Sequence, residues 1–190
     1  MKLLFRYGTM SSSKSANLLM LAYNYEKQGK KIIVIKPSIE NRDSDINIVS
    51  RTGLFRKVDY LVSYDTDIET LTGLDIDFIL VDECQFLHPR QIDQLRNLTK
   101  QCTVICYGLR TCFDTSLFPA SKRLMEIADS IEEIKTSCVF CNNKAIINLK
   151  YNKDGIIIKN NSSIIDLGGD DKYKSVCWEC WDDDSTLLKM

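Results

Sequence analysis

The segment Gly8-Thr9-Met10-Ser11-Ser12-Ser13-Lys14-Ser15 follows an apolar run at Leu3–Tyr7 and precedes a stretch with helical spacing at 15–28. It fits the phosphate-loop pattern G-x-x-x-x-G-K-[ST], except that Ser13 takes the place of the second glycine. A strand that turns into a helix in this way surrounds phosphate oxygens with backbone N–H groups. We therefore predict a nucleotide site at Gly8 to Ser15, where Lys14 reaches the β- and γ-phosphates and Ser15 ligates Mg²⁺.

A serine-rich turn that only caps the following helix is the alternative interpretation of this loop. A Lys-Ser pair alone would favour that alternative, whereas the position between an apolar strand and an amphipathic helix favours a phosphate loop. Ser13 is the residue that counts against the phosphate-loop interpretation. If the backbone there must adopt a conformation that only glycine tolerates, nucleotide binding would be weaker.

The pattern around the loop predicts an α/β fold. Apolar runs that are continuous rather than alternating are typical of parallel strands covered by helices on both faces. Such runs occur at 3–7, 31–36, 78–81 and 103–107, and helical spacing occurs at 15–28, 91–99 and 120–129. We therefore expect a P-loop sheet of the RecA-like kind, parallel and with helices on both faces, over residues 1–136.

Two acidic residues, Asp82 and Glu83, follow the apolar run at 78–81. In a phosphate-loop enzyme the acid at the end of such a strand approaches the Mg²⁺ held by the loop serine, which assigns Asp82 to the cofactor site. Neighbouring residues of a strand point to opposite sides, so Glu83 has a different task and is a candidate base for a hydroxyl or water. Two solvated acids at a strand end are the alternative.

The chain has eight cysteines, and the last four form two C-x-x-C pairs, Cys138 with Cys141 and Cys177 with Cys180. Two such turns complete a tetrahedron of thiolates, so we predict a small β module, a zinc ribbon, with a structural Zn²⁺ at these residues. Free or redox-active thiols are the alternative. Asp-Gly between apolar runs, at 154–155, predicts a β-hairpin that brings the two pairs together. The spacing gives no role to the remaining cysteines, Cys84, Cys102, Cys106 and Cys112.

The charge balance argues against a surface that binds nucleic acid. Lysine and arginine together number 25, aspartate and glutamate 26, and the formal net charge is −1. Proteins that bind DNA or RNA through phosphates usually carry a basic excess. No apolar run reaches the roughly 20 residues that span a bilayer, and the N-terminus lacks a cleavable signal. We therefore expect a cytoplasmic protein with no nucleic-acid or membrane partner.

The phosphate loop, the Asp-Glu pair and the four-cysteine segment occur together in one family. With Asp82-Glu83-Cys84-Gln85-Phe86, Tyr107-Gly108-Leu109-Arg110-Thr111 and 168–177, the chain resembles the type II, zinc-ribbon thymidine kinases over nearly its whole length. The resemblance implies an ATP-dependent kinase that phosphorylates thymidine, and deoxyuridine, at the 5′-hydroxyl. Together with the residue pattern, it predicts a P-loop domain at 1–136, a zinc-ribbon and lasso domain at 137–182, and a tail at 183–190.

The same resemblance assigns roles to single residues. Glu83 matches the catalytic base that takes the proton of the 5′-hydroxyl, and Arg42 matches an arginine near the phosphates. Residues 109–119 match the lasso loop that folds over the base. Side chains that match the walls of the nucleoside pocket are Met10, Phe86, Leu109, Phe113, Phe118 and Tyr173. The backbone segment that matches the contacts to the thymine edge comprises Ile164, Ile165, Asp166 and Leu167.

The resemblance further implies ATP, Mg²⁺ and structural Zn²⁺ as cofactors, a homotetramer, and feedback inhibition by thymidine triphosphate. Two other functions stay open at this point. One is a nucleotide-binding protein in which Ser13 has impaired catalysis, and the other is a zinc-ribbon P-loop ATPase that acts on nucleic acid. The near-neutral charge argues against the second of these.

Overall fold

The computed structural model describes residues 1–38, 46–159, 172–183 and 185. Its largest element is a six-stranded sheet in the order β5-β2-β6-β7-β1-β8, and all neighbouring strands in it are parallel. The strands are β1 (Leu3–Tyr7), β2 (Ile32–Pro37), β5 (Tyr60–Val62), β6 (Phe78–Val81), β7 (Thr103–Gly108) and β8 (Ser130–Glu133). The parallel α/β fold predicted from the apolar runs is therefore confirmed.

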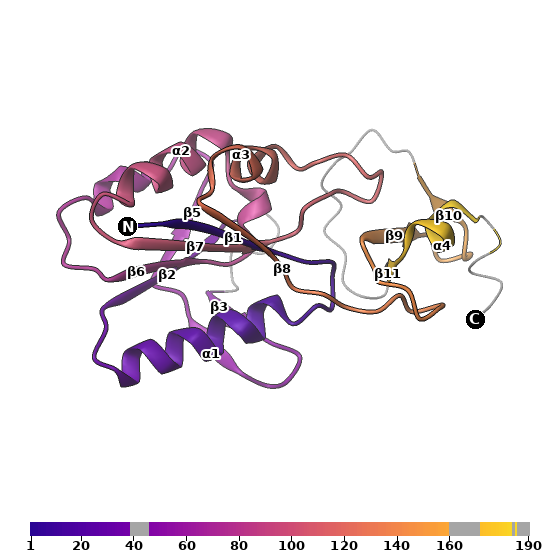
Figure 1. Ribbon diagram of the computed structural model, residues 1–190, viewed down its shortest axis with the longest axis horizontal. Coiled ribbons are helices and arrows are strands. Elements are labelled where there is room, and N and C mark those ends of the chain that lie inside the picture. The colour runs from indigo at the N-terminus through magenta and orange to yellow at the C-terminus, as the bar shows by residue number, and fades with distance from the viewer. Residues whose placement is uncertain (39–45, 160–171, 184, 186–190) are drawn as a thin grey trace.

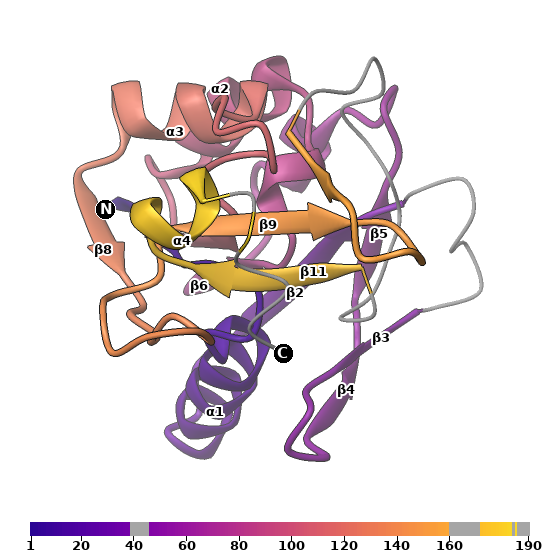
Figure 2. The same ribbon diagram turned by 90° about the vertical axis from the view of Figure 1, so that its right-hand side faces the viewer.

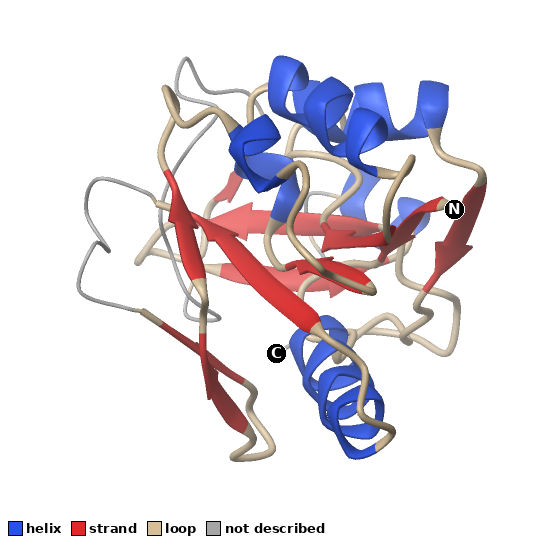
Figure 3. Cartoon of the chain, turned by 90° about the vertical axis from the view of Figure 1, so that its left-hand side faces the viewer, coloured by secondary structure: helices blue, strands red, loops and turns tan. Residues whose placement is uncertain are grey.

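Helices cover both faces of this sheet, as Figure 1 and Figure 3 show. Helix α1 (Lys14–Lys27) lies on one face, while α2 (Pro89–Leu98) and α3 (Pro119–Ile127) lie on the other. Side chains along a strand alternate between the faces, so Leu80 packs with the α1 layer and Ile79 with the α2 and α3 layer. Because both side chains are buried, the strand reads as a continuous apolar run.

Local signals explain where the helices begin and end. After α1 comes Gly29, whose φ of 75° is the left-handed conformation that glycine tolerates best. Helix α2 begins after the N-cap His88, whose Nδ1 accepts a hydrogen bond from the Arg90 N–H at 3.1 Å. The single histidine of the chain is thus a helix cap. None of the helices in the described part of the chain combines the length and the apolar character needed to cross a membrane.

Several short elements have no counterpart in the sequence pattern. They include the edge strands β5 and β8 and the antiparallel hairpin of β3 (Asn47–Val49) and β4 (Phe55–Lys57). Edge strands are paired on one side only and stay partly exposed, so they need no continuous apolar run. The 3₁₀ helices η1 (Ile68–Leu71) and η2 (Cys84–Phe86) are likewise too short to show a period.

The cysteine-rich segment forms a separate antiparallel sheet in the order β10-β9-β11. Its elements are β9 (Ile147–Tyr151), β10 (Ile157–Ile158), β11 (Tyr173–Val176) and the short helix α4 (Trp178–Asp182). The predicted turn joins β9 to β10, and Gly155 in it has a φ of 73°. Figure 1 and Figure 2 show this unit, called the ribbon below (residues 138–159 and 172–182), beyond the carboxyl ends of the sheet strands. The residue limits of the expected domains stay a prediction.

Candidate active site

The phosphate-loop segment forms the turn from β1 to α1, as predicted. Gly8 begins this turn, and a Cβ atom there would lie 2.4 Å from the Ser12 Oγ and 2.5 Å from the Ile134 carbonyl oxygen. Only glycine fits such close surroundings. The tight turn brings the N-terminus of α1 next to the end of β1, and a helix N-terminus attracts anions.

Two serines of the loop, Ser11 and Ser13, have a φ of 63°, in the left-handed region. Ser13 takes the place of the second glycine of the phosphate-loop pattern. Its backbone has the left-handed conformation that favours glycine. A side chain with a Cβ atom is destabilised there by roughly 1–2 kcal/mol. Serine strains the loop by that amount and still adopts its backbone conformation.

The loop holds polar atoms that its own residues leave unsatisfied. Among the described residues, the buried hydroxyl oxygens of Thr9 and Ser12 have no hydrogen-bond partner. The Lys14 Nζ donates to the Thr9 carbonyl oxygen at 2.7 Å, and burial lowers the pKa of this ammonium group against the opposing effect of Glu83. A cation and unsatisfied hydroxyls at a helix N-terminus fit the phosphates of a nucleotide.

Ser15 and Asp82 meet where α1 begins and β6 ends. The Ser15 Oγ lies 3.4 and 3.2 Å from the two Asp82 carboxylate oxygens, to which it donates. Asp82 is 4% exposed, and its burial, followed by the negative charge of Glu83, raises its pKa to about 7. A hydroxyl beside a buried carboxylate suits Mg²⁺, whose charge would favour the ionised form of Asp82. The two residues therefore fit the predicted magnesium site.

Glu83 has a φ of 51°, and this left-handed residue turns the chain from β6 into η2. The Gln85 Nε2 donates to the Glu83 Oε2 at 2.5 Å, while the Gln85 Oε1 accepts from the Leu109 N–H at 3.0 Å. Gln85 is buried, and it links the predicted base to the start of the predicted lasso loop. No sequence pattern assigns a role to Gln85, because its contact joins the ends of β6 and β7.

The side chains expected around the nucleoside come from distant parts of the chain. Phe86 and Phe118 contact each other edge to face, with ring centroids 5.8 Å apart. Phe113 is buried, and the Lys150 Nζ of β9 lies 4.5 Å from its ring centroid. The other expected side chains lie in the phosphate loop, after β7 and at the start of β11; they are Met10, Leu109 and Tyr173.

Some expected site residues lie outside the described part of the chain. Arg42 was expected near the phosphates, and a backbone segment was expected at the thymine edge. The members of that segment are Ile164, Ile165, Asp166 and Leu167. Their roles stay predictions.

The four cysteines of the two C-x-x-C pairs come together in the ribbon. The sulfur atoms of Cys138, Cys141, Cys177 and Cys180 all lie within 4.8 Å of one another. The Cys141 sulfur is 3.6 Å from that of Cys177 and 3.8 Å from that of Cys180. Around a tetrahedral Zn²⁺ with Zn–S distances of about 2.3 Å, the sulfurs are separated by about 3.8 Å. The group therefore fits a zinc ion, and four thiolates leave no open position for water.

The remaining cysteines are buried side chains outside this group, namely Cys84, Cys102, Cys106 and Cys112. Burial raises the pKa of both Cys102 and Cys112 to about 11. Thiols of this kind stay protonated at neutral pH and pack as small apolar side chains.

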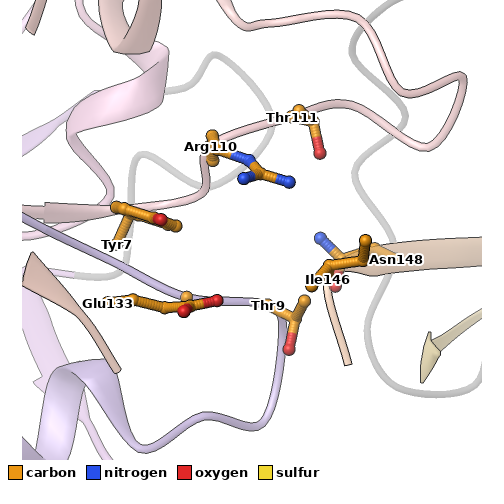
Figure 4. Close-up of a pocket in the computed structure, with 8 residues that line it drawn as sticks. Tyr7, Thr9, Arg110, Thr111, Glu133, Ile146 and Asn148 are labelled. Carbon is orange, nitrogen blue, oxygen red and sulfur yellow. The ribbon is translucent and has the colours of Figure 1, made fainter. Parts of the chain in front are cut away.

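A small cavity lies between the phosphate loop and the ribbon. Tyr7 lines it from the end of β1, Thr9 from the phosphate loop, Arg110 from the loop after β7, and Asn148 from β9 (Figure 4). Its volume of about 10 Å³ holds about one water molecule. The phosphate loop and the ribbon are therefore packed closely against each other at this point.

Known proteins similar to this chain share one description. A family model described as thymidine kinase matches residues 1–181. The thymidine kinase of Enterobacteria phage T4 is 38% identical over 188 residues, which cover 95% of this chain and 95% of the relative. The thymidine kinase of Chromobacterium violaceum is 37% identical over 187 residues, covering 96% and 99%. That of Haemophilus influenzae is 39% identical over 183 residues, covering 93% of each.

Proposed function

The chain belongs to the thymidine kinase family, and from this premise we propose that it transfers the γ-phosphoryl group of ATP to the 5′-hydroxyl of thymidine. The observation that carries the proposal is the meeting of Ser15, Asp82 and Glu83 beside the phosphate loop. This arrangement supports a kinase because one edge of the sheet offers a place for phosphates, a cation site and a base. The products are thymidine monophosphate and ADP.

The phosphate loop would receive the nucleotide. Backbone N–H groups at the start of α1 and the ammonium group of Lys14 would bind the β- and γ-phosphates. The pKa of Lys14 is lowered by burial in the free protein, and anionic phosphates would favour its charged form. Ser15 and Asp82 would hold Mg²⁺, which neutralises phosphate charge when bound.

Glu83 would act as the base. Its carboxylate accepts the proton of the 5′-hydroxyl while the hydroxyl oxygen attacks the γ-phosphorus of ATP. Gln85 supports this role because it donates to the Glu83 Oε2 and so fixes the orientation of the carboxylate. A fixed carboxylate reaches the hydroxyl without a further rearrangement.

Apolar side chains would enclose the nucleoside, among them Phe86, Phe113 and Phe118. An uncharged base is held by such walls together with a few backbone groups. Closure of the loop at 109–119 would exclude water, so that the phosphoryl group meets the sugar hydroxyl. We extend the proposal to deoxyuridine, because an apolar pocket discriminates only modestly against the loss of one methyl group.

Zn²⁺ would have a structural role, since four thiolates complete its coordination. The family resemblance also leads us to propose a homotetramer, feedback inhibition by thymidine triphosphate and a cytoplasmic location. Light scattering of the purified protein tests the tetramer. Inhibition of turnover by added thymidine triphosphate tests the feedback.

A kinase assay tests the proposed function. Purified protein with Mg²⁺, ATP and thymidine should form thymidine monophosphate and ADP in equal amounts, and omission of thymidine should suppress ADP formation. The same assay with single-stranded DNA in place of thymidine distinguishes the kinase from an ATPase that acts on nucleic acid. ADP formation that DNA stimulates, with no thymidine monophosphate, would contradict the proposal, and nucleotide binding without either product would mean that catalysis is impaired.

A further inference from the structure

The ribbon forms hydrogen bonds to the phosphate loop at Met10. The Asn148 Oδ1 accepts from the Met10 N–H at 2.7 Å, and the Ser175 Oγ donates to the Met10 carbonyl oxygen. Asn148 and Ser175 lie opposite each other on β9 and β11, so the two strands present an acceptor and a donor side by side. Figure 4 shows Asn148 near Thr9, the residue before Met10.

Both ribbon side chains are buried. Asn148 is 5% exposed and Ser175 is 4% exposed. Buried polar groups cost free energy unless they are hydrogen-bonded, and removal of one partner leaves the other unsatisfied. The contacts at Met10 are therefore the partners that make these two buried polar residues tolerable inside the ribbon.

Hydrogen bonds at Met10 can fix the backbone conformation of the phosphate loop. It directly precedes Ser11, and both Ser11 and Ser13 have a left-handed φ of 63°. Strained residues of this kind persist only where the surrounding structure fixes the backbone. The Met10 N–H and carbonyl belong to the peptide groups on either side of that residue, so the two hydrogen bonds hold both peptides ahead of Ser11.

We propose that Asn148 and Ser175 are positioning residues for the phosphate loop, through which the ribbon determines the affinity for the nucleotide. The inference rests on the assignment of Gly8 to Ser15 as the nucleotide site in the proposed function. The two residues act through Met10, whose fixed peptides preorganise the N–H groups of the loop. Preorganisation raises affinity because less order has to be created on binding.

A second set of ribbon residues contacts the loop at 109–119 and provides a matched control. The Trp181 Nε1 donates to the Phe113 carbonyl oxygen at 3.2 Å, and the Lys150 Nζ lies over the Phe113 ring. Trp181→Phe removes the hydrogen bond and keeps an aromatic ring. This variant should raise the KM for thymidine about threefold to tenfold and leave nucleotide affinity unchanged, because its partner lies on the nucleoside side.

The decisive comparison is Ser175→Thr with Ser175→Val, two side chains of nearly the same shape that differ by one hydroxyl. Calorimetry measures the Kd for a non-hydrolysable ATP analogue with Mg²⁺, and thermal unfolding confirms that each variant is folded. Ser175→Val should bind the analogue about threefold to tenfold more weakly than Ser175→Thr, the size of one hydrogen bond. Equal affinity of the two folded variants would overturn the proposal.

Asn148→Ala provides an independent measurement that also covers the case in which the added methyl group at position 175 prevents folding. It should weaken binding of the ATP analogue by a similar factor, and wild-type affinity in the folded variant would overturn the proposal. Binding needs no turnover, so the outcomes are separable. Absence of thymidine monophosphate would refute the proposed function, while unchanged nucleotide affinity in active variants would refute the positioning role.

Discussion

The six-stranded sheet and the ribbon meet at the candidate active site, and they are stabilised in different ways. Among the described residues, the two hydrophobic clusters of the sheet contain nineteen and nine buried residues. The ribbon cluster contains five, and two of these are Cys138 and Cys177. Burial of apolar surface, at about 25 cal/mol per Å², can hold the sheet. A cluster of five is small for three strands and a helix, so we propose that thiolate coordination of a zinc ion stabilises the ribbon.

The same division applies to the chemistry. The sheet and helix α1 carry the groups expected to react or to bind phosphate and Mg²⁺, namely Lys14, Asp82 and Glu83. The ribbon carries side chains that hold the loops around those groups, such as Asn148 at the phosphate loop and Trp181 at Phe113. We therefore expect the reacting groups to keep their places without zinc, while the loops around them depend on the ribbon and on its proposed zinc ion.

Glu83→Gln should produce the largest effect on the sheet side. Glutamine has nearly the same shape but cannot accept the proton of the 5′-hydroxyl, so kcat should fall about 10²- to 10⁴-fold. Steady-state kinetics with thymidine measure the loss, and nucleotide affinity should stay unchanged. Glu83→Asp, which keeps a carboxylate, should retain more activity. A wild-type kcat in Glu83→Gln would contradict the assignment of Glu83 as the base.

Cys177→Ser should produce the next largest effect, on the ribbon side. Loss of one thiolate should leave less than one zinc per chain and lower kcat/KM about 10- to 100-fold, because the loops lose their support. Metal analysis and kinetics measure both changes. Cys102→Ser, a buried cysteine of the sheet cluster, is the matched control and should keep zinc and activity while losing about 1 kcal/mol of stability. Full zinc content in Cys177→Ser would contradict the assignment.

Asp82→Asn should have a smaller effect that depends on pH. The pKa of Asp82 in the folded protein, about 7, lies above its ordinary value of 3.8, so ionisation of the buried carboxylate destabilises the fold. This cost is absent below about pH 4, grows as the pH rises and is complete above about pH 7. Without Mg²⁺ and nucleotide, Asp82→Asn should therefore be more stable than the wild type at pH 8, with a Tm higher by several degrees.

Calorimetry of the wild type and Asp82→Asn over a series of pH values checks this expectation. The difference in Tm should shrink as the pH falls toward 4, since the wild-type carboxyl group is then protonated in both the folded and the unfolded protein. A lower Tm for the variant at pH 8 would show that the carboxylate stabilises the sheet.

Ser13→Gly should give the smallest effect. The Ser13 side chain makes no capping hydrogen bond, and its φ of 63° favours glycine. The variant should gain about 0.5–1 kcal/mol of stability, after the greater freedom of glycine in the unfolded chain is subtracted. Denaturant unfolding measures the gain, with Ser12→Gly as a control that has no left-handed φ to relieve. A Ser13→Gly protein that is less stable than the wild type would contradict the conclusion that the Ser13 backbone is strained.

Local signals made much of this molecule predictable from its sequence. The continuous apolar runs predicted the four central strands, and Asp-Gly at 154–155 predicted the turn that joins β9 to β10. The edge strands β5 and β8 could not be predicted, because short half-exposed strands carry no strong pattern.

The candidate site divides in the same way. The phosphate loop, the Asp-Glu pair and the cysteine pairs are visible as motifs, since their residues are close in sequence. Asn148 and Ser175 are not, because each contributes through Met10, a partner that only the fold brings near. Asn148 and Ser175 are 138 and 165 residues from Met10 along the chain.

Hydrogen exchange measured by mass spectrometry, before and after zinc chelation of the purified protein, tests whether the ribbon holds the phosphate loop in place. Chelation should speed exchange in the ribbon, at 138–159 and 172–182, and also at the phosphate loop, where the Met10 N–H would lose its partner Asn148. Strands β1, β6 and β7 should keep their protection, because hydrophobic burial holds them. Loss of protection throughout the sheet, or a phosphate loop unaffected while the ribbon opens, would contradict the account.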